Sequence, residues 1–152
     1  IMAGAGIGLD APDGVELPVT SCDLWPTVLA ITRTPMRKSD GMNLAPLVSG
    51  LGEVEFSPDR PIFWHYPHYN QHPSSAPISI IRRGPWKLIE FLDSGQVELY
   101  HLGEDIGESQ DLSEEKPKLA AELLKQLADW KREVGADPMQ PNPQYKKKEV
   151  VE

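Results

Sequence analysis

The chain has 152 residues, of which 39% are hydrophobic and 25% are charged, and its formal net charge at pH 7 is −8. This length and composition fit a globular domain of modest size. The acidic surplus argues against a general binder of the nucleic-acid backbone, which needs a basic face. Nucleic acid is therefore not an expected partner.

The first residues, Ile1 to Gly14, are typical of the tail of a buried strand that enters a glycine-rich loop. They contain neither a basic segment nor an apolar run long enough for a signal peptide or a membrane span. We expect the sequence to begin inside a larger domain. Cys22 is the single cysteine, so no internal disulfide can form. Cysteine usage therefore does not indicate an oxidising or a reducing cellular compartment.

The segment from Thr20 to Ile31 predicts a helix. Asp23 suits the positive end of a helix, and Pro26 is compatible with one only in the first turn. The apolar spacing predicts one buried face, formed by Leu24, Val28 and Ile31. Thr34-Pro35 ends this helix, and a second short helix is expected over residues 43–48.

Four runs rich in β-branched and aromatic residues predict strands, at residues 62–65, 78–82, 86–91 and 97–101. Compact turn signals separate the last three runs, so these should pair as an antiparallel meander. The alternation of apolar and polar residues along the third run is imperfect. It predicts a sheet that is covered at least in part on both faces.

Residues 117–134 have the apolar spacing of an amphipathic helix, with Pro117 in its first turn and Gly135 just past its end. The helix should pack across the meander and form a small α+β layer. The remaining residues, 136–152, contain Pro138, Pro141 and Pro143 and predict an extended arm with a frayed end.

Imidazole and phenol side chains gather in the segment after the first strand, where His65, His68 and Tyr69 could hydrogen-bond sugar hydroxyls or a sulfate group. The alternative is that His65 ends an internal strand with its polar atoms satisfied by backbone. A metal site that adds His72 is weaker, because neighbouring prolines break helical geometry and no carboxylate or cysteine completes the set.

Arg82 and Arg83 offer guanidinium groups that suit sulfate as well as carboxylate. We assign Arg83 a structural role, pairing with an acidic loop, and keep Arg82 as a candidate for binding substrate. Trp86 and Trp130 are expected in the core. The acidic run over residues 98–115 lacks the alternating ligands of a calcium loop and predicts a solvated turn.

Taken in order, these elements resemble the carboxy-terminal part of the type I sulfatases, the formylglycine-dependent arylsulfatase family, and more closely its bacterial members that act on sulfated sugars. The resemblance covers about residues 1 to 145. Its motifs are Asp23-Leu24-Trp25-Pro26-Thr27, Asp40-Gly41 with Leu44 and Pro46-Leu47, Arg60-Pro61 leading to Trp64-His65-Tyr66-Pro67, Ile81-Arg82 with Gly84 and Trp86-Lys87-Leu88-Ile89, Glu98-Leu99-Tyr100, Asp105 to Glu108, and Asp111-Leu112.

The resemblance implies a division of the chain into three parts. Residues 1–50 would end a larger α/β domain of the alkaline-phosphatase-like kind, residues 51–135 would form a small α+β subdomain with an antiparallel sheet of about four strands packed against a helix, and residues 136–152 would be an arm and tail. A periplasmic or secreted location is also implied. The missing amino-terminal catalytic domain and a sulfated sugar would be the partners.

Formylglycine forms in this family at a Cys-x-Pro-x-Arg or Ser-x-Pro-x-Arg motif. Cys22 does not fit, since Pro26 lies four positions on, and the Ser75-Ala76-Pro77 segment has Ser79 in place of the arginine. The resemblance places the calcium ligands upstream as well. We therefore expect no cofactor or catalytic residue in this chain, which would be inert alone and would line the substrate site of its parent with His65, His68, Tyr69 and Arg82. The alternative is a non-catalytic carbohydrate-binding or interaction module.

Overall fold

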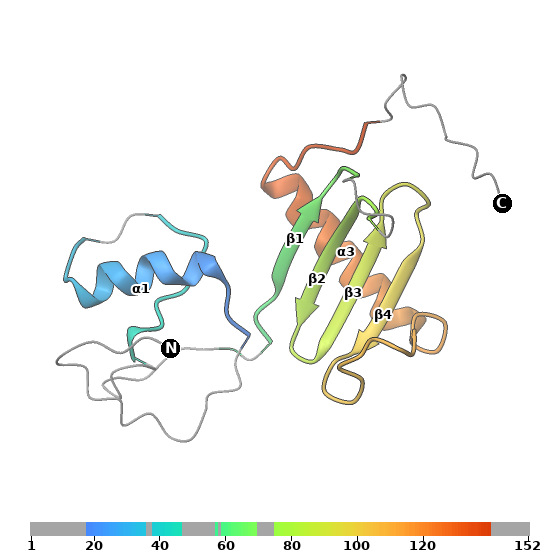
Figure 1. Cartoon of the computed structure of the whole chain (residues 1–152), viewed down its shortest axis with the longest axis horizontal. Helices are drawn as coiled ribbons and strands as arrows, with labels where there is room; N and C mark the ends of the chain where they lie inside the picture. The colour runs from blue at the N-terminus through green and yellow to red at the C-terminus, as the bar shows by residue number, and fades with distance from the viewer. Residues whose placement is uncertain (1–17, 36–37, 47–56, 58, 70–74, 141–152) are drawn as a thin grey trace. The chain divides into compact units, whose positions relative to one another are not determined.

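The computed structural model describes residues 18–35, 38–46, 57, 59–69 and 75–140. The chain divides into two compact units, residues 1–60 and residues 61–152 (Figure 1). Arg60 ends the first unit, and its side chain binds Asp23 within that unit.

The first unit contains a single turn of 3-10 helix, Ser21–Asp23, which leads directly into α1, Leu24–Ile31. Pro26 lies in the first turn of α1, as predicted, where its missing N–H leaves no helical bond unmade. Ala45 and Pro46 are helical, and the rest of the short helix expected over residues 43–48 lies outside the described residues.

The predicted buried face of α1 is wrong within the described residues. Leu24, Val28 and Ile31 are 47%, 46% and 45% exposed, whereas Pro26, Thr27 and Leu29 are buried. The cause is a hydrogen bond: the Leu44 amide donates to the buried Thr27 hydroxyl at 2.8 Å, so a polar side chain faces inward. Apolar spacing alone identifies an apolar stripe, not the side of the helix that packs.

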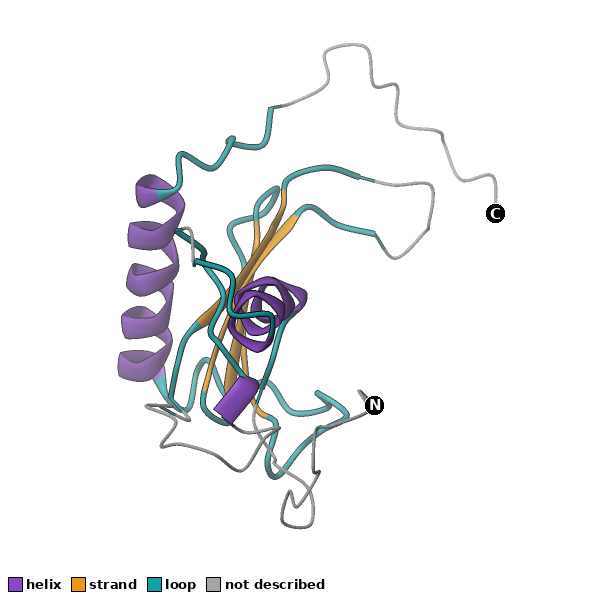
Figure 2. Cartoon of the chain, turned by 90° about the vertical axis from the view of Figure 1, so that its left-hand side faces the viewer, coloured by secondary structure: helices purple, strands orange, loops and turns teal. Residues whose placement is uncertain are grey.

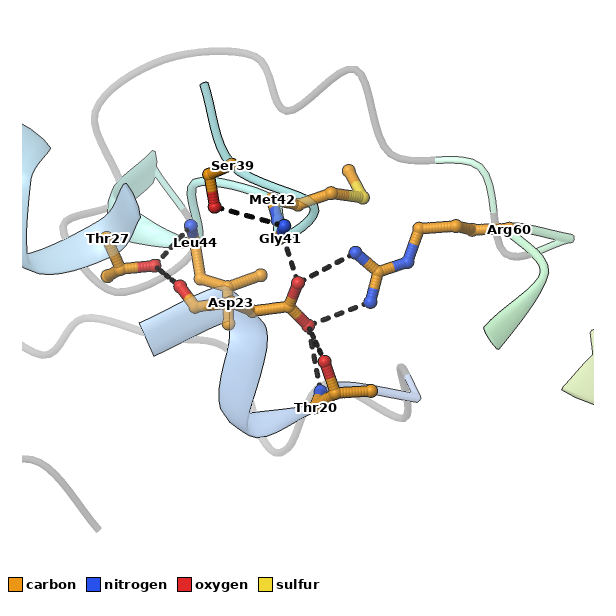
Figure 3. Close-up of polar contacts among 8 residues, drawn as sticks. All are labelled: Thr20, Asp23, Thr27, Ser39, Gly41, Met42, Leu44 and Arg60. Atoms are coloured by element: carbon orange, nitrogen blue, oxygen red, sulfur yellow. Dashed lines mark hydrogen bonds and ion pairs between the residues drawn. The ribbon is translucent and has the colours of Figure 1, made fainter. Parts of the chain in front are cut away.

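A buried carboxylate, Asp23, organises the first unit (Figure 3). Both its oxygens accept from the guanidinium of Arg60, each at 2.8 Å, and the amides of Thr20 and Met42 donate to it at 2.8 and 2.7 Å. Burial by itself raises the pKa of Asp23, but the hydrogen bonds from Arg60, Met42 and Thr20 outweigh burial and lower the pKa to about 2.

The loop at Gly41 approaches the start of the helix very closely. A Cβ atom at Gly41 would lie 1.9 Å from the carbonyl oxygen of Cys22, which no side chain can tolerate. The same approach brings Met42 to Asp23 and Leu44 to Thr27. Glycine is therefore required at residue 41 for the buried polar contacts to form.

The second unit is built on a four-stranded antiparallel sheet with the strand order β1-β2-β3-β4. The strands are β1, Ile62–Tyr66; β2, Ile78–Arg83; β3, Trp86–Phe91; and β4, Val97–His101. All four predicted strands and the meander are confirmed, and β1 joins the sheet by pairing with β2. Gly84 and Gly95 take positive φ in the two turns, as their sequence signals predict.

One face of this sheet is covered by α3, Pro117–Glu133, which lies across the strands (Figure 2). The core between them consists of fully buried aliphatic side chains, namely Ile81, Leu88, Leu99, Leu123 and Leu127. Phe63 of β1 stacks on Trp130 of α3, with ring centroids 4.7 Å apart. Trp86 and Trp130 pack against this core, as predicted. No described helix is long and apolar enough to span a membrane.

Replacement of Asp23 by Asn should destabilise the first unit by about 3 kcal/mol, because it removes the buried negative charge that accepts from Arg60 and from the Thr20 and Met42 amides. In the unsubstituted chain, folding lowers the pKa of Asp23 from its ordinary value of 3.8 to about 2. The ionised carboxylate therefore stabilises the fold fully above pH 3.8, and this stabilisation is lost as the pH falls toward 2. The measurement is residue-resolved denaturant unfolding of α1 at pH 7 and at pH 2.

Asp40→Asn is the matched control, since Asp40 is an exposed carboxylate of the same unit. It should change the unfolding free energy by no more than about 0.5 kcal/mol. Equal unfolding free energies for the Asp23→Asn and Asp40→Asn variants would show that the buried ion pair does not stabilise the unit.

Candidate functional site

The four residues that the sequence singled out for substrate binding lie in three separate places in the second unit. Arg82 pairs with Ile62 at the start of β1, whereas His68 and Tyr69 follow Tyr66 at its other end. His65 alternates with Tyr66 along the strand and therefore faces the opposite side of the sheet. Of the four, only His68 and Tyr69 lie in the same place.

His65 uses both ring nitrogens in hydrogen bonds within the fold. Its Nδ1 lies 2.8 Å from the hydroxyl of Ser79, which is fully buried in β2, and its Nε2 lies 2.7 Å from the carbonyl oxygen of Asp137. The Asp137 carbonyl can only accept, so Nε2 carries the hydrogen and Nδ1 accepts from Ser79 in the neutral ring. His65 thereby joins β1 and β2 to the segment that follows α3.

His68 and Tyr69 lie beside the turn that connects β3 and β4. The ring of His68 meets the ring of Tyr66 edge-on with centroids 4.3 Å apart, and the Tyr69 hydroxyl donates to Asp93 Oδ2 at 2.8 Å. Tyr69 is 59% exposed. This end of the sheet therefore presents an imidazole, a phenol and a carboxylate that can exchange hydrogen bonds with a polar ligand.

Arg82 lies on the face of the sheet that α3 leaves uncovered. It lines a groove of about 390 Å³ together with aromatic, aliphatic and charged side chains, namely Trp64, Tyr66, Ile78, Ile80, Lys87, Leu102 and Glu108. Sequence reasoning did not assign Lys87 or Glu108 to a site. Strand alternation placed Lys87 on one face with Ile89 and Phe91, but no local signal indicates that Glu108 joins it.

Arg83 has the structural role predicted for it, with a different partner. Its Nη1 donates to Glu122 Oε1 at 2.7 Å and to Gln126 at 3.2 Å, both on α3, so it ties the sheet to the helix rather than to the acidic loop. Lys131 of α3 forms a second such link with Glu90 of β3. These contacts lie on the face opposite the groove.

The acidic loop after β4 is held by its own backbone. Asp105 accepts from the amides of Ser109 and Gln110 at 2.7 and 2.9 Å, and Asp111 accepts from the amides of Leu99 and Ser113, each at 2.9 Å. The hydrogen bond from Gln110 is the main cause of the lowered pKa of Asp105. These carboxylates cap turns, which agrees with the predicted solvated turn.

The described residues do not fit the calcium that the resemblance implies for the complete enzyme. Among them, no three histidine, cysteine, aspartate or glutamate side chains gather closely enough to hold a metal ion. Ser79, the residue in place of a motif arginine, is buried in β2 and bound to His65. Cys22 is exposed in the 3-10 turn that precedes α1.

No family model matches the chain. Arylsulfatase K of Danio rerio is 27% identical over 125 residues, which is 80% of this chain and 24% of that protein. Over that stretch the chain is similar in sequence to a sulfatase. It spans about a quarter of the length of this relative.

Several solved structures share the fold of this chain. A 2-O GAG sulfatase has a TM-score of 0.63 at 23% identity, with 80% of this chain and 27% of that chain covered. A protein solved in complex with its substrate D-glucosamine-2-N,6-O-disulfate has a TM-score of 0.62 at 23% identity, with 79% of this chain and 25% of that chain covered. A phosphonate monoester hydrolase of Agrobacterium radiobacter has a TM-score of 0.58 at 21% identity, with 78% of this chain and 26% of that chain covered.

Replacement of His65 by Ala should release the segment around Asp137, because the imidazole is its hydrogen-bonded link to β1 and Ser79. We expect the rate of amide hydrogen exchange over residues 136–140 to rise at least about tenfold, because the variant loses one or two hydrogen bonds. His68→Ala is the matched control, since His68 lies in a different place on the same segment. Equal exchange in both variants would remove His65 from this role.

Proposed function

We propose that this chain is the carboxy-terminal part of a sulfatase that hydrolyses sulfate esters of sugars. The single observation that carries the proposal is the similarity to arylsulfatase K, which runs over 80% of this chain but over only 24% of that protein. The fold shared with a 2-O GAG sulfatase supports it. The neighbour with a disulfated glucosamine substrate supports sugar as the substrate class.

In the complete enzyme, formylglycine would supply the nucleophile and calcium would neutralise the sulfate oxygens. The residues of this chain would bind and orient the sugar. His68 and Tyr69 offer a ring N–H and a hydroxyl for sugar hydroxyls at the end of β1, and Arg82 offers a guanidinium for an acidic group. His65 would act indirectly, by fixing β1 against Ser79 and Asp137.

A second reaction class deserves a direct test because a phosphonate monoester hydrolase shares the fold. Sulfate and phosphonate monoesters are both tetrahedral oxyanions, so the described residues favour neither on charge alone. A non-catalytic carbohydrate-binding module is the remaining alternative. It would use the same exposed aromatic and imidazole side chains without chemistry.

The complete gene product should hydrolyse a small aryl sulfate faster than a phosphonate monoester and should contain a formylglycine peptide by mass spectrometry. In that enzyme His68→Ala should lower kcat/KM for a sulfated sugar about tenfold, because the variant loses one hydrogen bond to the sugar. Turnover of the aryl sulfate and the melting temperature should not change. Faster phosphonate hydrolysis would overturn the sulfatase assignment, and an unchanged kcat/KM for the sugar would exclude His68 from the site.

We propose further that the exposed apolar face of α1 packs against the catalytic domain of the parent. Trp25 is 58% exposed, and Leu24, Val28 and Ile31 extend the same apolar surface. Soluble monomers seldom leave such a continuous stripe uncovered. The chain alone should therefore bind a hydrophobic dye such as ANS, and the complete enzyme should bind much less of it.

The double variant Leu24→Gln, Val28→Gln should reduce dye binding by the chain without loss of stability, since both side chains are already exposed. Leu29→Ala, a buried site on the same helix, should instead destabilise the unit by about 3 kcal/mol. A monomeric chain that binds no dye would contradict a packing role for this face.

A further inference from the structure

The uncovered face of the sheet in the second unit is apolar where an exposed antiparallel sheet is usually polar. Trp64 and Tyr66 stand on it from β1, 46% and 39% exposed. Ile80 and Ile78 lie directly opposite them on β2 and form the floor of the groove of about 390 Å³. A volume of this order suits a small ligand, and aromatic walls beside an aliphatic floor suit a flat apolar surface.

One end of the groove carries two cations side by side. Arg82 and Lys87 are directly opposed across β2 and β3, an arrangement that repels unless it is neutralised. Glu108 neutralises one of them, since both its carboxylate oxygens accept from Lys87 Nζ at 2.7 Å. It does so from a backbone φ of 53°, which is unusual outside glycine.

Arg82 keeps its charge uncommitted among the described residues. Its one hydrogen bond there runs from Nε to the carbonyl oxygen of Gly84 at 3.5 Å, and none of its described neighbours supplies it with a carboxylate. Arg83, the next residue, is by contrast paired with Glu122. Arg82 is half-buried and has no carboxylate partner among the described residues, so its guanidinium can bind an external oxyanion.

We propose that this groove binds an acidic sugar unit, with its ring stacked on Trp64 and its sulfate or carboxylate group on the guanidinium of Arg82. The aromatic wall and the free cation lie in one groove, so a ligand that carries both an apolar ring face and an anion satisfies both. Sulfate is preferred as the acidic group only because of the proposed function. His68 contacts Tyr66 at the end of the groove away from Arg82, so the groove would hold a neighbouring unit of a longer substrate.

The test is NMR titration of the 152-residue chain with three probes: a sulfated disaccharide, its desulfated counterpart and inorganic sulfate. We expect the Trp64 indole signal to shift with the sulfated disaccharide at a Kd at least tenfold below that for either of the others. A uronic-acid disaccharide without sulfate distinguishes carboxylate from sulfate as the recognised group. Two matched pairs of variants accompany the titration.

Arg82→Gln should weaken binding of the sulfated disaccharide about tenfold or more. Arg83→Gln removes the same charge from the other face of the sheet and should leave binding unchanged. Trp64→Ala, followed by the backbone amide signals of β2 because the reporter indole is gone, should weaken binding in the same way, and Trp25→Ala should not. Retained strand signals show that each variant is folded.

The proposal is overturned if inorganic sulfate binds as tightly as the sugar, if Arg83→Gln weakens binding as much as Arg82→Gln, or if Trp64 is inaccessible to solvent in the complete enzyme. The last outcome would mean that protein covers the groove. Aryl sulfate hydrolysis by the complete enzyme needs no sugar ring, so its loss would count against the proposed function and not against the groove.

Discussion

The first unit depends on one buried carboxylate. Asp23 is removed from water, which costs free energy for a charged group. The fold offsets that cost by surrounding its two oxygens with donors from the neighbouring Thr20 and from two segments distant in sequence. The donors belong to the start of the helix, to Met42 and to Arg60. Each of these segments is therefore fixed relative to the others by the need to satisfy Asp23.

This dependence explains what the sequence motifs encode. Asp23, Thr27, Gly41 and Arg60 all belong to motifs that resemble the sulfatases, yet in the structure they build a buried polar junction (Figure 3). The hydroxyl of Thr27 donates to the Asp23 carbonyl and accepts from Leu44, so it too is used internally. The resemblance therefore reports a shared fold more directly than a shared chemistry.

The elements that sequence reasoning predicted correctly are those fixed by local chemistry. Gly84 and Gly95 mark turns, and the spacing of leucines along α3 fixes its buried face. The errors and omissions come from contacts between residues far apart in sequence. The inward side of α1 is set by Leu44, the partner of Lys87 is Glu108, and His65 meets Asp137, and none of these pairings has a local signal.

Two surfaces formed by described residues are apolar, and their chemistry differs in a way that separates their uses. The face of α1 consists of aliphatic and indole side chains without a charge among Leu24, Trp25, Val28 and Ile31, which suits burial against protein. The groove on the sheet combines Trp64 with Arg82, and a guanidinium buried there without an oxyanion would be destabilising. A surface that needs an anion to be covered is better suited to an acidic ligand than to an apolar protein face.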